Sequence, residues 1–471
     1  MRISELLIVG CVSLSLAGCA LPPATPVAPP PIAISPQQWQ APLPHNGNVS
    51  DLTRWWQDLG DPLLVELQDA AQLASPSLAS ARSRVIQGRA ALSQTRAALG
   101  PTLDASASAG RAANQPATPA TTSLAAGVSA SWEIDVFGAN RLASEAAQAR
   151  LASAQATWHD ARVLVAAEVA SRYFGQRACE QQRRIAQADA QSRRETARLT
   201  ELTLKAGFTP AATAALARAA ASDANGRVLR QRALCALDVK ALVALTGLPE
   251  APLVQRLAQA PLALAPDARL VVSTLPADTL AQRPDIFAAQ RDLDAARAEL
   301  GGAQAQRYPR LALSGSIGAL HYRAGGNSGD MPTWSIGPLA LSLPLFDGGR
   351  REAGVAAAQA RYDESAALVQ ARVRQAVREV EQALVVLQST QERIADAITA
   401  ETGYRAWQDG TEARYKGGLA SLAELEDARR ISLAAADALV ALRLERLQAW
   451  IDLYRAAGGG WSSAEATLRQ P

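Results

Sequence analysis

The sequence is poor in the residues that usually build a catalytic or metal site. Its 471 residues include only four cysteines and three histidines, and 4% of them are aromatic. The histidines at positions 45, 159 and 321 are scattered, and the chain has no metal-ligand spacing, nucleophile elbow or phosphate-binding loop. We therefore expect no enzyme activity, no catalytic residues and no metal or cofactor site.

An excess of one charge and a long apolar run are also missing. Lys and Arg total 47 against 44 Asp and Glu, so the net charge is +3, and both signs alternate along the helical segments. No basic patch stands out, which argues against a nucleic-acid partner. No segment has the length and apolarity of a transmembrane helix.

The N-terminus carries a short apolar run over residues 6–16, which is typical of a signal peptide and too short to span a bilayer. The run ends in Leu-Ala-Gly-Cys at Cys19, which resembles the bacterial lipoprotein box. We expect residues 1–18 to be a lipoprotein signal peptide and Cys19 to carry a covalent lipid. Residues 19–50, rich in Pro and Ala, would form a tether. An ordinary signal peptide followed by a chance cysteine is the alternative.

The rest of the chain repeats one plan. Pro76 corresponds to Pro284, and Pro101 to Pro309, both at an offset of 208. Further matches continue at nearly the same offset as far as Lys205 and Lys416. We predict two structural repeats, 51–279 and 280–458, followed by a C-terminal tail, 459–471. Each repeat would contain a helix, two strands and a long helical hairpin.

The predicted strands alternate apolar with small or polar residues, which is typical of transmembrane β-strands. The alternating positions are Leu124, Ala126, Val128, Ala130, Trp132, Ile134 and Val136; Leu311, Leu313, Gly315, Ile317 and Ala319; and Trp334, Ile336, Leu339, Leu341, Leu343 and Leu345. The third run changes phase at Gly337-Pro338, where we expect a β-bulge. A soluble sandwich is the alternative, but four strands cannot form one around so much helix.

Four strands cannot close a barrel either, and an open edge in lipid would leave backbone groups unpaired. The chain should therefore share its barrel with copies of itself, and three copies would supply twelve strands.

The first hairpin predicts a disulfide. Helical pattern runs over 139–205, breaks around Gly207 and resumes to residue 245. Cys179 and Cys235 are equally far from Gly207, one before it and one after it, so the two cysteines should be level in an antiparallel hairpin. Two free buried thiols remain the alternative.

The second long helix is predicted over 354–415, with a length of ~90 Å at 1.5 Å per residue. Its predicted seam follows a heptad spacing through Val373, Val377, Val380, Leu384, Leu387, Gln391, Ile394 and Ile398. Such a helix would project far into an aqueous space. A plain coiled-coil stalk would not explain the strands.

Four motifs then indicate a family. They are WWQDLGDPLL from Trp55, RPDIFAAQRDLDAARAELG from Arg283, RYPRLALSGSIG from Arg307 and ARYKGGLASLAELEDARR from Ala413. Over nearly all of the mature chain the sequence resembles outer-membrane channels of TolC type, in the NodT-like lipoprotein branch. The resemblance implies an α+β membrane protein. Four transmembrane strands per protomer would enter a shared trimeric 12-stranded β-barrel above a long α-helical coiled-coil periplasmic barrel.

The resemblance also implies site residues. The hairpin tips, which would contact an adaptor, are Gly207, Phe208, Thr209, Gly417, Gly418 and Leu419. The gate at the periplasmic entrance would contain Glu424, Asp427 and Arg430, although a solvated helix face is the alternative for them. Glu426 stands where the family often has Leu.

The implied function is a passive exit duct in the outer membrane for drugs or toxic compounds. Its partners would be two further copies, a periplasmic adaptor, an inner-membrane pump and outer-membrane lipid. A type I protein-secretion duct and a structural trimeric surface protein are the alternatives.

Overall fold

The computed structural model describes residues 39–40, 55–113, 120–260 and 280–461. The predicted signal peptide, the lipid site at Cys19 and most of the tether lie outside the described residues. The chain forms two compact units. Their described parts come from residues 85–153 and 289–369 in the first unit, and from 39–84, 154–288 and 370–461 in the second. Each unit therefore draws on both predicted repeats, and neither repeat is a compact unit by itself.

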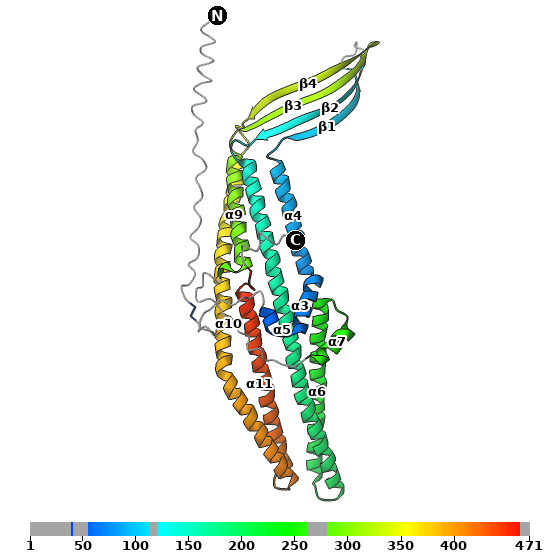
Figure 1. Ribbon diagram of the computed structural model, residues 1–471, viewed down its shortest axis with the longest axis vertical. Coiled ribbons are helices and arrows are strands. Elements are labelled where there is room, and N and C mark those ends of the chain that lie inside the picture. The colour runs from blue at the N-terminus through cyan, green and yellow to red at the C-terminus, as the bar shows by residue number, and fades with distance from the viewer. Residues whose placement is uncertain (1–38, 41–54, 114–119, 261–279, 462–471) are drawn as a thin grey trace. The chain divides into compact units, whose positions relative to one another are not determined.

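The two halves of the chain have the same order of elements (Figure 1). The first half contains α2 (Trp55–Asp58), α3 (Pro62–Ala74), α4 (Pro76–Ala97), β1 (Thr102–Ala112), β2 (Thr121–Ile134), α5 (Ala139–Lys205), α6 (Ala211–Thr246) and α7 (Glu250–Gln259). The second contains α9 (Pro284–Ala305), β3 (Arg310–Ala324), β4 (Asn327–Ser342), α10 (Arg350–Lys416) and α11 (Leu422–Ala456). The predicted succession of helix, two strands, long helix and helix thus occurs twice. None of the described helices combines the length and apolarity needed to cross a membrane.

The four strands form one antiparallel sheet in the order β1-β2-β3-β4. Residues paired directly across strands project from the same face. One such row joins Ala105, Val128, Ile317 and Trp334. We call the face that carries this row the apolar face, and Ile317 and Trp334 on it are 68% and 75% exposed.

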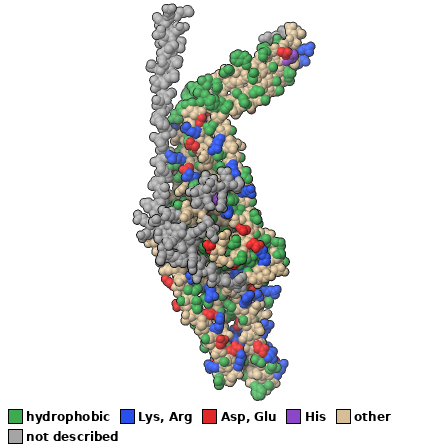
Figure 2. Space-filling view, viewed as in Figure 1, with side chains coloured by type: hydrophobic (Ala, Val, Ile, Leu, Met, Phe, Trp, Pro, Cys, Tyr) green, Lys and Arg blue, Asp and Glu red, His purple; other side chains and the backbone are tan. Residues whose placement is uncertain are grey.

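Small and polar residues form the other side, the polar face. One of its rows joins Asp104, Ser129, Ser316 and Ser335. The hydroxyls of Ser316 and Ser335 lie 2.9 Å apart. Figure 2 shows hydrophobic side chains spread over the sheet. The two faces therefore suit different surroundings, one apolar and one polar.

The predicted bulge is confirmed. Leu313 pairs with Leu339 and Gly315 pairs with Ile336, so Gly337 and Pro338 together oppose Ser314. The extra residue explains why the apolar alternation of β4 changes phase there.

Two strand ends were predicted too long. Val136 lies beyond β2, because the Asp135 carboxylate accepts hydrogen bonds from the N–H groups of Asn140 and Arg141 at the start of α5. Leu343 and Leu345 lie beyond β4. Pro344, between them, has no N–H for a strand ladder, and a strand does not continue easily through it.

The second unit has a large core around the aromatic residues of its N-terminal segment. The Trp55 ring stacks on Tyr454 at 4.9 Å, and Trp56 meets the same ring edge-on at 4.7 Å. Tyr173 is fully buried and donates to Asp61, the residue that caps α3, at 2.5 Å. The ring contacts therefore join α2 to α11, and the hydrogen bond joins the start of α3 to α5.

The predicted seam of α10 is correct only in its N-terminal part. Val373, Val380 and Leu387 are buried, but Gln391 and Ile398 are exposed. The buried stripe runs through Val369, Val373, Ala376, Val380, Ala383, Leu384, Leu387 and Thr390. Buried alanines at positions 376 and 383 widen the predicted stripe, because small side chains also pack closely between helices.

Candidate functional site

Both helical hairpins end in the same type of turn. Gly207 and Gly418 adopt φ values of +80° and +75°, a conformation that favours glycine. The next residue donates its N–H to the carbonyl five positions earlier, from Phe208 to Thr203 at 2.9 Å and from Leu419 to Arg414 at 2.8 Å. This pattern is a Schellman motif, which ends a helix and satisfies its last carbonyls.

The turns expose one large apolar side chain each. Phe208 is 85% exposed and Leu419 is 75% exposed. Thr209 forms a hydroxyl contact of 2.7 Å with Thr203, so its side chain stabilises the turn. The two hairpins therefore present exposed apolar side chains at equivalent positions.

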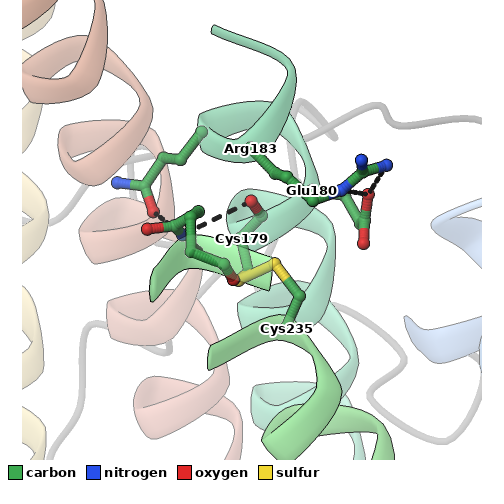
Figure 3. Close-up of a disulfide and its surroundings, with 6 residues drawn as sticks. Cys179, Glu180, Arg183 and Cys235 are labelled. Carbon is green, nitrogen blue, oxygen red and sulfur yellow. Dashed lines mark hydrogen bonds and ion pairs between the residues drawn. A yellow bond between two sulfur atoms is a disulfide. The ribbon is translucent and has the colours of Figure 1, made fainter. Parts of the chain in front are cut away.

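A disulfide joins the helices of the first hairpin. The Sγ atoms of Cys179 on α5 and Cys235 on α6 are bonded at 2.08 Å (Figure 3). This pairing is the predicted one. Gln231 of α6 also donates to the Cys179 carbonyl and to the Gln182 side chain at 3.4 and 3.1 Å. The first hairpin is therefore cross-linked both covalently and by hydrogen bonds.

The three predicted gate residues lie in the first turns of α11, but they do not act as one group. Glu424 belongs to a capping box with Ser421. The backbone N–H of Ser421 donates to the Glu424 carboxylate at 2.6 Å. That hydrogen bond lowers the pKa of Glu424. Asp427 and Arg430 pair with each other and remain largely exposed. Sequence spacing correctly placed Asp427 and Arg430 on one helix face.

A buried charge network lies one helix face away. Arg193 of α5 pairs with Asp189 at 2.9 Å and with Glu426 of α11. Arg429 bonds Glu426 at 3.1 Å and the Thr196 hydroxyl at 2.8 Å. The side chains of Arg193, Glu426 and Arg429 are only 8%, 12% and 3% exposed. This network fastens α11 of the second hairpin to α5 of the first.

The network extends to both outer helices. Arg227 of α6 pairs with Asp189 at 2.8 Å, and Glu412 of α10 lies 3.6 Å from Arg429. Burial lowers the pKa of Arg429, although Glu412 and Asp189 oppose that change. Burial also raises the pKa of Asp437, and the nearby Arg227 works against it.

A groove of about 600 Å³ lies beside this network. Residues of α6 and α11 line it, together with Arg193 of α5. Its charged lining includes Asp223, Arg227, Asp427, Arg430 and Asp437. The exposed pair of Asp427 and Arg430 therefore borders an open space rather than a helix contact.

Sequence reasoning missed the network although one signal was visible. Glu426 occupies a position where an apolar residue was expected, and a carboxylate there needs a buried cation. The cations are Arg193 and Arg429. Arg429 lies three residues after Glu426 on the same helix, so a local pattern could have predicted this contact. Arg193 is 233 residues away from Glu426, so no local pattern could have predicted that one.

Comparisons with known proteins identify the family of this chain. The profile of the family described as outer membrane efflux protein matches residues 67–248 and again residues 275–459. Both the starts and the ends of the two matches are therefore related by nearly the same offset as the repeat in the sequence.

Relatives match the chain over almost its full length. The pyoverdine export outer membrane protein OpmQ of Pseudomonas aeruginosa is 30% identical over 446 residues, covering 91% of this chain and 92% of OpmQ. Nodulation protein T of Rhizobium leguminosarum bv. trifolii is 30% identical over 473 residues, covering 96% of each chain. The solved outer-membrane channel OprN superposes with a TM-score of 0.78 at 27% identity, covering 91% of this chain and 98% of OprN. The chain belongs to the outer membrane efflux protein family.

Proposed function

We propose that three copies of this chain form the exit duct of a tripartite efflux system. Each copy would contribute β1 to β4 to one 12-stranded barrel in the outer membrane, and its hairpins to a helical tunnel in the periplasm. The duct would conduct passively. An inner-membrane pump, coupled through a periplasmic adaptor, would supply the energy.

The four-stranded sheet is the observation that carries this proposal. Its outer strands, β1 and β4, have no further strand beside them in the described part of the chain. Its apolar face exposes Ile317, Trp334 and Leu341. In lipid that face would be covered, but the two edges would each leave backbone groups unpaired at several kcal/mol per group. Pairing β4 of one copy with β1 of the next removes both edges.

The hairpin ends support the proposed coupling. Phe208 and Leu419 are exposed apolar anchors on rigid turns, and such side chains favour a protein contact. We propose that these tips, Ala206–Thr209 and Lys416–Ser421, contact the adaptor. The groove lined by Asp427 and Arg430 would border the entrance, and these two residues would help to hold it closed.

The cargo class follows from the family and from one relative. The family is one of efflux, and the name of OpmQ states that it exports pyoverdine. We propose small organic compounds as the cargo. The polar face of the sheet, with its serine and glycine rows, would give such compounds a hydrated path.

Single-channel conductance in a planar bilayer tests the duct and its entrance together. The wild type should show a small, closed-like conductance, which should rise in the double variant Asp427→Ala/Arg430→Ala. The matched control is Arg393→Ala/Glu445→Ala, which removes an exposed 2.6 Å ion pair between α10 and α11 away from the groove. An unchanged small conductance in both variants would place the gate elsewhere. No conductance from an assembled trimer would favour a structural surface protein.

A further inference from the structure

Two arginines lie together at the loop end of the apolar face. Arg111 of β1 pairs in register with Thr122 of β2, and Thr122 pairs with Arg323 of β3. Ser328 of β4 completes this row. Directly paired residues share a face, so all four project from the same side as Val128 and Trp334. All four side chains are exposed.

The two positive charges are not neutralised within the described part of the chain. Neither Arg111 nor Arg323 has an ion pair or a side-chain hydrogen bond there. The acid in the neighbouring row of this face, Asp330, bonds Nδ1 of His321 at 2.7 Å. The segment between β1 and β2, residues 113–120, contains no Asp or Glu. Figure 2 shows basic, acidic and histidine side chains gathered at this end of the sheet.

The row sits at a defined height above the apolar band. The apolar residues of β2 extend from Leu124 to Ile134, which is ten steps along the strand. At about 3.3 Å per residue and a strand tilt of about 40°, this span is ~25 Å high, which is the height of the apolar band of outer-membrane barrels. Arg111 and Arg323 lie one row further, about 5 Å beyond it. That is the level of lipid headgroups.

We propose that Arg111 and Arg323, with Thr122 between them, bind the phosphate group of a lipid in the outer leaflet. Because adjacent strands are about 4.8 Å apart, the two arginine Cα atoms are separated by about 10 Å. Two side chains of this length can converge on one phosphate over the intervening threonine. Guanidinium groups match phosphate oxygens in bidentate geometry, and the Thr122 hydroxyl can donate a further hydrogen bond.

The surface beneath the arginines favours a lipid over a free phosphate ion. The next row pairs Leu124 with His321, which is bonded to Asp330, and below it Ala126 and Val128 continue along β2 with Ile317 beside Val128 on β3. Acyl chains attached to the bound phosphate would cover this apolar surface. A free phosphate ion would be attracted only by two exposed arginines, and water and salt screen that attraction strongly. The site rests on the proposed function, since it requires the sheet to span the outer membrane with its apolar face toward lipid.

Lipid retention measured by native mass spectrometry tests the site. Full-length protein would be titrated with bisphosphorylated lipid A and, separately, with the same lipid after removal of its phosphates. Arg111→Gln/Arg323→Gln should bind the phosphorylated lipid about 30-fold more weakly than wild type, because two basic residues near a charged lipid surface are removed. Arg310→Gln, on the polar face at the other end of β3, is the matched control and should bind like wild type.

The wild type alone provides a test that needs no variant. Dephosphorylated lipid should bind it as weakly as phosphorylated lipid binds the double variant. Equal binding of both lipids would overturn the proposal, and so would displacement of the lipid by millimolar inorganic phosphate. A failure of the wild type to insert into bilayers would instead refute the proposed function. Normal insertion and conductance with unchanged lipid retention in the double variant would refute the lipid site alone.

Discussion

Glu426 and Asp427 are neighbours in sequence with opposite surroundings. The Glu426 side chain is 12% exposed and contacts two arginines, whereas Asp427 is 48% exposed and pairs with Arg430 within its own helix. Removing one partner of a buried ion pair leaves an uncompensated charge, which costs far more than losing an exposed pair. Both residues border the groove, but only Glu426 belongs to the network that holds the hairpins together.

Glu426→Gln should lower the free energy of unfolding by about 3 kcal/mol, because Arg193 and Arg429 lose their shared carboxylate. Asp427→Asn is the matched control and should cost less than about 1 kcal/mol. Thermal unfolding of the detergent-solubilised protein would measure both. Equal losses in the two variants would mean that the network contributes no more than a surface pair.

Asp160 gives the second unit a pH dependence. Burial raises the pKa of Asp160 to about 6, and Asp285 adds to the effect while Arg283 and Arg372 oppose it. The folded protein binds this proton more tightly than the unfolded chain, in which the pKa of Asp160 is near 3.8. The stability contribution of this residue should therefore fall as the pH rises from about 4 to about 6.

Asp160→Asn should thus raise the free energy of unfolding at pH 7 by at most about 3 kcal/mol, and by nothing at pH 4. The measurement is thermal unfolding as a function of pH. Asp396→Asn, at an exposed position on α10, should leave the pH profile unchanged. A gain that is the same at pH 4 and pH 7 would contradict the assignment to Asp160.

At the scale of elements, local signals predicted what local physics determines. The break at Gly207 and Pro210 predicted the end of α5 at residue 205, where the helix does end. The phase change at Gly337-Pro338 predicted the bulge in β4. By contrast, β1 reads TLDASASAGRA and shows no alternation of large apolar residues, so only its place in the repeat indicated a strand. The contact of Arg193 with Glu426 depends on the packing of two hairpins, which no local pattern encodes.

The disulfide cross-links the first hairpin, and the second hairpin has no such cross-link. Cys179 and Cys235 close a loop with a sequence separation of 56, while α10 and α11 contain no cysteine. Cys179→Ser/Cys235→Ser should cost about 3–4 kcal/mol, because the cross-link restricts the unfolded chain. Hydrogen exchange should increase in α5 and α6 and stay unchanged in α10 and α11. Increased exchange in both hairpins would show that the bridge stabilises more than its own hairpin.

At the scale of the whole molecule, the account depends on which face of the sheet meets lipid. Val128 and Ser129 are adjacent on β2 and point to opposite faces, near the middle of the apolar band. An arginine facing lipid at mid-membrane costs about 2–4 kcal/mol, whereas one in a polar lumen is tolerated. These two positions give a matched pair on one strand.

Val128→Arg should therefore reduce the amount of protein assembled in the outer membrane, and Ser129→Arg should assemble normally. Heat-modifiable mobility of outer-membrane fractions on gels would report the assembly. The reverse outcome, with loss of assembly only in Ser129→Arg, would mean that the polar face is the one turned toward lipid.

The central claim is that one duct contains three copies of this chain. Its most direct test is the mass of the detergent-solubilised particle by native mass spectrometry. The account predicts three chains per particle, because only shared strands satisfy the edges of β1 and β4 in lipid. A particle of one chain, stable without detergent, would contradict it.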